Sequence, residues 1–407
     1  MHQTTPSFSL DTTIQLPGTQ GGHGDWVTYD PATHTVWLAQ SPDNNVVVID
    51  TRTNTVKAVI SDVTNGNGIA VGPQYAYVAD PTHNVVDVID KYSYKIVAKV
   101  PATGTTLDSV TYLAATQQVY VASDDNNVLD AISANPPFSQ TASYKLTASS
   151  TGPDVATYAK GTIYMPDGVK VDAIDPTNGQ ILASPTLVSS GAVKPGVYDP
   201  VTNQFFGTTD NQIEVVSGSG TGGIGGVVGT IKLAGSTDEA AIDVRSRLAF
   251  FGDKVGQVDV VNLDSMKVVA TLPAETGMHT LTVNPQTHEL YVYENNRNVV
   301  DVWKYSNGAI TQAHGPWIHT GSPDHMAFAN GDAGFTGSDL TQQDLKSALS
   351  GMQGTPGMQG TPGMQGTVIS GAQIDLSGSG QPVGVAGLNQ WTGSGAKGVL
   401  TAINHGT

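Results

Sequence analysis

The sequence contains no cysteine and few charged residues. Without Cys there are no disulfides, thiol nucleophiles, thiolate metal sites or covalent haem attachment through a Cys pair. Charged residues make up 13% of the chain, about half of the usual share. Gly (47 residues), Thr, Ser, Asn and Asp are abundant instead, and these residues are typical of turns and strand surfaces rather than helices. The composition therefore favours an all-β protein.

Basic residues are also scarce, because 18 Lys and Arg stand against 35 Asp and Glu, which gives a net charge of −17. A surface of this kind repels phosphate backbones and anionic lipid, so nucleic acid is not an expected partner and cations are better candidates. No apolar stretch approaches the roughly 18 residues that span a bilayer, so no membrane insertion is expected. The N-terminal "MHQTTPSFSL" lacks the profile of a signal peptide. Two alternatives follow: a protein that stays inside the cell, or a mature exported form with an added Met.

What the chain does contain is an internal repeat. The segments "WVTYDPATHTVWLAQSPDNNVVVIDTRTNTVKAVI" and "GIAVGPQYAYVADPTHNVVDVIDKYSYKIVAKV" show the same unit of four strands separated by Asp, Asn and Thr turns. A spacing of roughly 40 to 46 residues between units is the period of a four-stranded propeller blade. The first strands of the units begin near Trp26, Gly68, Ser109, Val155, Pro195, Glu239, Thr280 and His325.

The unit "YVADPTHNVVDVIDKYSYKIVAKV" resembles the YVTN-type β-propeller repeat, whose signature is a strand of this kind, an Asn-bearing turn, a V-x-V-I-D strand and a T-x-x-V strand. The resemblance covers roughly residues 8 to 337. It implies a β-propeller fold. It implies little about activity, because the family includes many surface, periplasmic and uncharacterised proteins.

Eight units predict an eight-bladed β-propeller, with seven blades as the alternative. The N-terminal "FSLDTTIQLPGTQGG" is similar to "MKVVATLPAETGM", which is a fourth strand leading into the next blade. We therefore predict that residues 8–16 supply the fourth and outermost strand of the last blade, which also contains the strands near Met326. The third strand of that blade is predicted at Gln373 to Leu376. Closure of this kind leaves no open sheet edge in the ring.

Three regions follow from this assignment. Residues 1–337 form the propeller, with the N-terminal strand closing the last blade. Residues 338–371 contain a short helix, capped by Ser338 or Asp339, and the triplets "GMQGTPGMQGTPGMQGT". Glycine at every third position is typical of a collagen triple helix. A duplicated hexapeptide that forms an extended loop is the alternative. Residues 372–407 hold the last-blade strand and a C-terminal tail, in which "KGVLTAIN" predicts one more strand.

The candidate site is a ring at the start of the first strands, where a propeller's central channel opens. Converging carboxylates favour a bound cation or shifted proton affinities, whereas the alternative is that each Asp tightens its own turn. Alignment of the units places at this position Asp25, Asn67, Asp108, Asp154, Lys194, Asp238, His279 and Asp324. The predicted metal ligands are Asp25, Asp108, Asp154, Asp238, His279 and Asp324. Ca²⁺ or another divalent cation suits the oxygen ligands, and added histidines would favour a transition metal.

No catalytic residues and no organic cofactor are predicted, because close-spaced motifs such as H-E-x-x-H do not occur. The first hypothesis is a non-catalytic extracellular or cell-surface propeller that binds or assembles. Its insertion and tail would mediate self-association into an oligomer or filament, so the expected partner is the protein itself. The alternative hypothesis is a metal-binding or small-ligand site in the central channel, hydrolytic or redox in character.

Overall fold

The computed structural model describes residues 6–18, 26–104, 106–123, 127–147, 156–187, 193–306, 367–373 and 399–402, the last two ranges by their backbone alone. The chain divides into two compact units, which are described separately. The first contains seven antiparallel sheets of four strands each. The second contains a sheet of two strands. No α-helix occurs among the described residues, which hold only the 3₁₀ turns η1 (Ser41–Asp43) and η2 (Thr221–Gly223).

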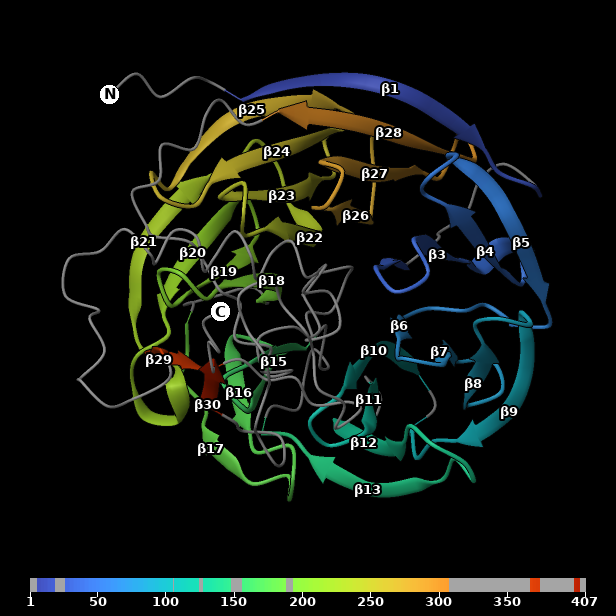
Figure 1. Cartoon of the computed structure of the whole chain (residues 1–407), viewed down its shortest axis with the longest axis horizontal. Helices are drawn as coiled ribbons and strands as arrows, with labels where there is room; N and C mark the ends of the chain where they lie inside the picture. The colour runs from blue at the N-terminus through green and yellow to red at the C-terminus, as the bar shows by residue number, and fades with distance from the viewer. Residues whose placement is uncertain are drawn as a thin grey trace, which may run out of the picture. The chain divides into compact units, whose positions relative to one another are not determined.

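The seven sheets are the blades of a β-propeller arranged in a ring (Figure 1). In each blade the four strands lie side by side, with the first strand nearest the channel and the fourth at the rim. The first three blades are formed by β2 (Trp26–Asp30), β3 (Thr35–Gln40), β4 (Asn45–Asp50) and β5 (Thr55–Ser61); by β6 (Ile69–Val71), β7 (Tyr75–Asp80), β8 (Val85–Asp90) and β9 (Lys95–Pro101); and by β10 (Leu107–Leu113), β11 (Gln118–Ser123), β12 (Val128–Ser133) and β13 (Gln140–Lys145).

The next three blades are formed by β14 (Thr157–Ala159), β15 (Thr162–Asp167), β16 (Lys170–Ile174) and β17 (Ile181–Ala183); by β18 (Lys194–Asp199), β19 (Gln204–Thr209), β20 (Gln212–Ser217) and β21 (Val227–Lys232); and by β22 (Thr237–Asp243), β23 (Leu248–Asp253), β24 (Gln257–Asn262) and β25 (Lys267–Pro273). The last blade consists of β26 (Leu281–Asn284), β27 (Glu289–Glu294), β28 (Val299–Ser306) and β1 (Ser7–Gln15).

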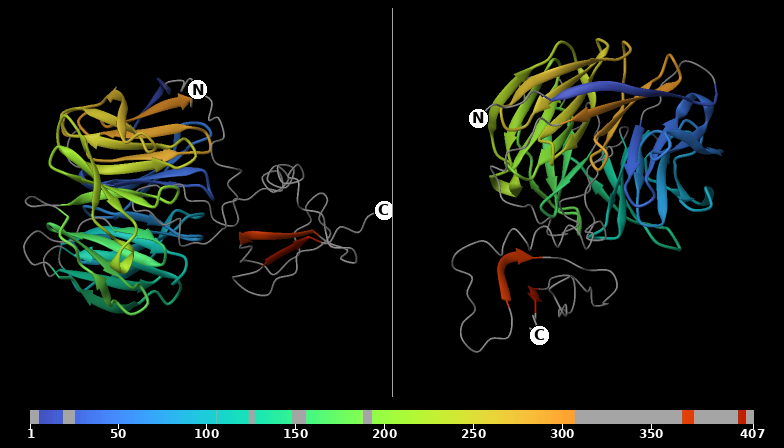
Figure 2. Two further views of the ribbon diagram at one scale, coloured as in Figure 1. Left: turned by 90° about the vertical axis from the view of Figure 1, so that its left-hand side faces the viewer. Right: turned by 45° about the horizontal axis from the view of Figure 1, so that its top comes forward.

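The predicted blade count of eight is wrong, because the ring contains seven blades. The N-terminal strand is the outermost strand of the last blade, but that blade is the seventh. β1 pairs antiparallel with β28, with Phe8 opposite Tyr305 and Ile14 opposite Val300. Figure 2 shows the blue N-terminal strand beside the orange strands of this blade. The seventh sheet is therefore complete without any residue after Ser306.

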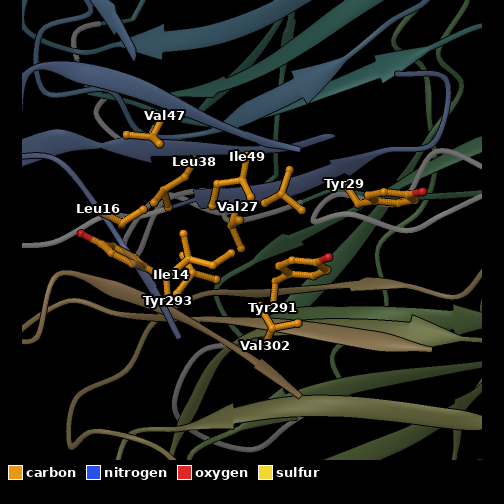
Figure 3. Packing of buried hydrophobic residues seen from close by; sticks show 12 residues of the cluster. Ile14, Leu16, Val27, Tyr29, Leu38, Val47, Ile49, Tyr291, Tyr293 and Val302 are labelled. Atoms are coloured by element: carbon orange, nitrogen blue, oxygen red, sulfur yellow. The ribbon is translucent and has the colours of Figure 1, made fainter. Parts of the chain in front are cut away.

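The seventh blade also packs directly against the first, which leaves no place for another blade between them. One buried apolar cluster joins β1, β27 and β28 to β2, β3 and β4. Figure 3 shows Ile14 and Tyr291 of the last blade facing Val27 and Ile49 of the first. The backbone N–H of Val27 donates to Oγ1 of Thr280 over 3.0 Å. Burial of this apolar surface favours closure of the ring, and the ring therefore closes with seven blades.

Apart from the N-terminal strand, the segments that were predicted to form the eighth blade and the C-terminal region do not belong to the seven-bladed ring as the structure describes it. The region near Met326, the predicted helix and the glycine triplets up to Gly366 lie outside the described residues. β29 (Thr367–Gln373) pairs with β30 (Val399–Ala402) in the second unit. The third strand of the last blade is β28 rather than the predicted Gln373 to Leu376, of which residues 374–376 lie outside the described residues. β30 lies inside "KGVLTAIN", where one more strand was predicted.

Each blade contributes one buried aromatic residue to the packing between blades. The third residue of every second strand is aromatic and at most 2% exposed: Trp37, Tyr77, Tyr120, Tyr164, Phe206, Phe250 and Tyr291. The hydroxyls of Tyr77 and Tyr120 donate to the carbonyls of Ala134 and Pro176 in the next blade, each over 2.7 Å. Such rings add apolar area and a polar contact at the same interface, so the blades are held by both.

Candidate functional site

The structure brings together two of the six predicted metal ligands. Asp25, Asp154 and Asp324 lie outside the described residues. Asp238 of β22 and His279, which precedes β26, come from neighbouring blades, and Oδ2 of Asp238 lies 2.7 Å from Nδ1 of His279. Asp108 lies on β10, where its carbonyl accepts the N–H of Gly68 over 2.9 Å. Among the residues that the structure describes, no three His, Asp or Glu side chains are placed to hold a metal ion.

Lys254 completes a cluster with these two residues, which we call the Asp238 cluster. Its Nζ lies 2.6 Å from the same oxygen, Oδ2 of Asp238. The backbone of Lys254 is fixed at this position, because its N–H donates to the carbonyl of Ser236 and its carbonyl accepts the N–H of Gly277. The blade-entry loops before β22 and β26 therefore meet at Lys254. Sequence comparison missed this residue, because it lies on the loop between second and third strands.

The electrostatics of the cluster favour an ionised carboxylate. Burial raises the pKa of Asp238, but the hydrogen bonds from His279 and Lys254 outweigh this and hold the pKa well below its usual range. The side chains are 16% (Asp238), 21% (His279) and 37% (Lys254) exposed. Asp238 is thus the anion that pairs with both a lysine and a histidine. Lys254 and His279 can bind a polar or anionic group. Oδ2 of Asp238, a predicted metal ligand, is already occupied by its contacts with these two residues.

Most other acidic residues of the propeller have structural partners. In six blades the third residue of the third strand is acidic and nearly buried, and it bonds to a residue of the fourth strand or directly after it. The pairs are Asp87–Lys99, Asp130–Gln140, Asp172–Ser184, Glu214–Thr230, Asp259–Thr271 and Asp301–Thr13. Burial raises the pKa of Asp87 to about 6, although the hydrogen bond from Lys99 lowers it. These carboxylates attach the outermost strand of each blade.

A second set of carboxylates holds the loops that enter the blades. The acidic residue at the end of the second strand accepts a backbone N–H from the entering loop. Asp253 accepts from Gly235 over 2.7 Å, and Glu294 accepts from Glu275 over 2.7 Å. Burial raises the pKa of Glu294 to about 7. The positions of the channel-mouth loops therefore depend on carboxylates that sequence analysis did not single out.

Ion pairs between neighbouring blades lie at the opposite ends of the first strands. Nζ of Lys91, which is 1% exposed, lies 2.6 Å from Oδ2 of Asp30 in the preceding blade. Arg247 binds both oxygens of Asp199 in the same way, over 2.7 and 2.6 Å. A charge at these positions is satisfied by its partner rather than available to a ligand. Asp30 and Asp199 are not positions of the predicted ring, and their role is to join neighbouring blades.

A groove of about 510 Å³ lies at the rim between the fourth and fifth blades. One wall is the chain from Ala183 to Leu187. The other comes from Ile224 to Gly226, in the loop that precedes β21, and from Val227, the first residue of β21. This loop lies against the fourth blade, because Gly222 has a φ of +65° and its carbonyl accepts the hydroxyl of Tyr164 over 3.0 Å. A side chain at Gly222 would come within 3.2 Å of the Cβ of Ala173. Glycine therefore allows the close approach.

Comparison with known proteins agrees with the fold. A structure of hydrazine synthase from Kuenenia stuttgartiensis is similar, with a TM-score of 0.62 and 16% identity over 72% of this chain and 100% of that chain. The Cps50 (Swd1) β-propeller domain of Myceliophteria thermophila is similar with a TM-score of 0.61 and 12% identity, over 73% of this chain and 99% of that domain. No protein-family model matches the sequence, and no curated protein matches it either. At these identities the likeness shows a β-propeller and nothing about activity.

No helix among the described residues is long and apolar enough to cross a membrane.

Proposed function

We propose that this chain is a non-catalytic β-propeller protein of the cell exterior, in which the propeller is a binding scaffold and the C-terminal region mediates self-association. The observation that carries the proposal is the completeness of the ring. Ser7 to Ser306 supply all four strands of all seven blades. Residues 307–407, about a quarter of the chain, are not needed to close it and are available for contacts with other molecules.

Two further observations support an assembly role. The carboxylates of the propeller are occupied in holding strands, loops and blades together, which is the task of a scaffold. The resemblance to YVTN-type repeats favours a cell-surface or periplasmic setting, and the absence of Cys from all 407 residues is compatible with it. The collagen-like glycine triplets at residues 351–367 would then contribute to the assembly device.

Sedimentation velocity over a range of concentrations tests this function. We expect the full chain to form oligomers or filaments, and we expect deletion of residues 338–371 or 377–407 to abolish or reduce them. A full chain that remains a strict monomer at high concentration would contradict the proposal. Electron micrographs of the same samples distinguish closed oligomers from filaments.

The Asp238 cluster supports a second candidate function, a metal-binding or small-ligand site at the channel mouth. Asp238 and His279 come from neighbouring blades and lie 2.7 Å apart, and Ca²⁺ or another divalent cation suits carboxylate ligands. Elemental analysis and the melting temperature with Ca²⁺ or Zn²⁺ test it, using Asp238→Ala and His279→Ala. This function requires metal to co-purify with the wild type and to be lost in both variants. A wild type that neither carries metal nor melts at a higher temperature with either ion would exclude it.

A further inference from the structure

The outermost strands of the blades present open edges at the rim, and six of the seven carry a charged residue. Charges, and lysine above all, discourage such edges from pairing with other strands. The charged residues of these strands are Asp11 in β1, Lys57 in β5, Lys95 and Lys99 in β9, Lys145 in β13, Lys232 in β21 and Lys267 in β25. β17 has none.

β17 differs from the other outermost strands in length as well as in charge. It spans three residues, whereas the others span six to nine. The chain continues beyond it as "SPTL", still without charge, and returns to the sheet at the isolated bridge between Thr186 and Lys170. This uncharged edge forms one wall of the rim groove. It lacks the charged residue that discourages strand addition at the other edges.

The surface beside the groove is apolar and exposed. Leu182 is 38% exposed, and Val227 and Val228 on the facing β21 are 42% and 53% exposed. Ala183, Pro185, Leu187 and Ile224 line the groove itself. An extended, uncharged segment with β-branched residues suits such a surface, because an edge supplies main-chain hydrogen bonds and the groove accepts alternate side chains.

The same chain contains a segment with this chemistry. "TVISGAQ", residues 367–373, carries no charge, and from residue 347 to the C-terminus the only acidic or basic residues are Asp375 and Lys397. This segment forms β29, and among the residues that the structure describes its sheet contains one other strand, β30. An isolated pair of strands is marginally stable in water and gains from a third strand. Pairing of β29 with the β17 edge would therefore give the two-stranded sheet a third strand and would cover the apolar surface beside the groove.

We propose that residues 367–373 of one copy of this chain dock by strand addition on the β17 edge and rim groove of a second copy. The inference rests on the proposed self-association and names the surface that it uses. It assigns the occupant as a second copy because the segment follows a long low-charge stretch that the ring does not need.

Leu182→Lys tests the surface, because it gives β17 the charge that the other edges carry at a side chain already exposed. Val268→Lys on β25 is the matched control, since Val268 is 37% exposed on an edge that already has Lys267. In sedimentation velocity of the full chain, we expect Leu182→Lys to weaken self-association by about tenfold or more, and we expect Val268→Lys to leave it within about twofold. Circular dichroism verifies that both variants are folded.

A cross-linking experiment tests the occupant, and the absence of native cysteine makes it clean. Thr186→Cys and Ser370→Cys are prepared as separate full-length variants and mixed under oxidising conditions. We expect a disulfide-linked heterodimer on a non-reducing gel, and we expect less of it when Leu182→Lys is added to the Thr186→Cys chain.

The outcomes separate the inference from the function on which it rests. If deleting residues 367–407 abolishes self-association but Leu182→Lys has no effect and no heterodimer forms, the tail docks elsewhere and this inference is wrong. If a single chain carrying both cysteines forms an internal disulfide independent of concentration, the occupant is the chain's own tail and the second-copy assignment is wrong. If the full chain is a monomer throughout, the proposed function fails as well.

Discussion

At the scale of single residues, the acidic excess of the chain is explained by partners inside the propeller. Asp30, Asp87 and Glu294 are all nearly buried, and each accepts a hydrogen bond through at least one oxygen from another strand, loop or blade. A buried carboxylate without a partner is costly, so the partners matter more than the charges themselves. Two predictions follow for individual side chains.

Lys91→Met should destabilise the protein strongly. The substitution keeps most of the volume of the side chain but removes the only cation that the structure shows at Asp30. Breaking a buried pair on one side costs about 3–5 kcal/mol of unfolding free energy. Urea denaturation measures this, and Arg52→Met, which removes an exposed partner of Asp50, is the control with little expected effect. The double variant Asp30→Asn with Lys91→Met should recover part of the loss. A Lys91→Met protein as stable as the wild type would contradict the structural role.

Glu294→Gln should change how stability depends on pH. Because burial raises the pKa of Glu294 from 4.5 to about 7, the folded state binds a proton that the unfolded state has released in this range. The free energy of unfolding of the wild type should therefore fall as pH rises from about 4.5 to about 7. Gln removes this contribution, which is on the order of 2–3 kcal/mol. The variant should gain stability relative to the wild type between pH 5 and pH 8.

Denaturation curves at pH 5 and pH 8 provide the measurement. Asp90→Asn is the control, because hydrogen bonds from Ser93 lower the pKa of Asp90, so that residue is ionised in both states across this range. It should leave the difference between the two pH values unchanged. If Glu294→Gln also leaves that difference unchanged, burial of Glu294 does not have the assigned effect.

At the scale of elements, the N-terminal strand β1 closes the ring. Ile14 and Leu16 are 5% and 4% exposed and pack in the cluster that joins the last blade to the first. Leu10, on the same strand, is 49% exposed. β1 should therefore contribute to stability through one end more than through the other.

Ile14→Ala should cost about 2–5 kcal/mol of unfolding free energy, since it leaves a cavity between two blades. Leu10→Ala is the matched control and should stay within about 0.5 kcal/mol of the wild type. Urea denaturation of both variants measures the difference. Equal effects of the two substitutions would show that β1 does not close the ring through this cluster.

Sequence patterns predicted the strands well and the number of blades poorly, for a physical reason. Alternation of apolar and polar residues depends on local burial, so four-stranded units were recognisable. The similarity of residues 8–16 to "MKVVATLP" shows that they form a fourth strand, but not to which blade that strand belongs. The unit that begins near His325 then suggested an extra blade. The packing of Val27 against the last blade depends on contacts distant in sequence, which a repeat does not reveal.

The sequence also predicted one part of the candidate site, the proximity of Asp238 and His279, and missed the rest. Equivalent positions in adjacent blades lie beside each other around the axis, so the alignment brought Asp238 to His279 correctly. Lys254 had no periodic signal because the other blades lack a lysine at that loop. The partners of the buried acids were also missed, although an acid in the middle of six third strands was visible in the sequence.

At the scale of the whole molecule, Ser7 to Ser306 form a complete seven-bladed ring, and we propose that the C-terminal region serves assembly. The ring requires Ser7 to Ser306, and the low-charge sequence beyond it has no role in closing a blade. This division is the central claim, because the proposed self-association and the β17 docking surface both depend on it.

The most direct test compares the full chain with a chain that ends after Ser306, by sedimentation velocity and thermal melting. We predict that the shortened chain is a folded monomer whose melting temperature lies within about 4 °C of the full chain, whereas the full chain self-associates. A shortened chain that fails to fold, or that self-associates as strongly as the full one, would contradict the account.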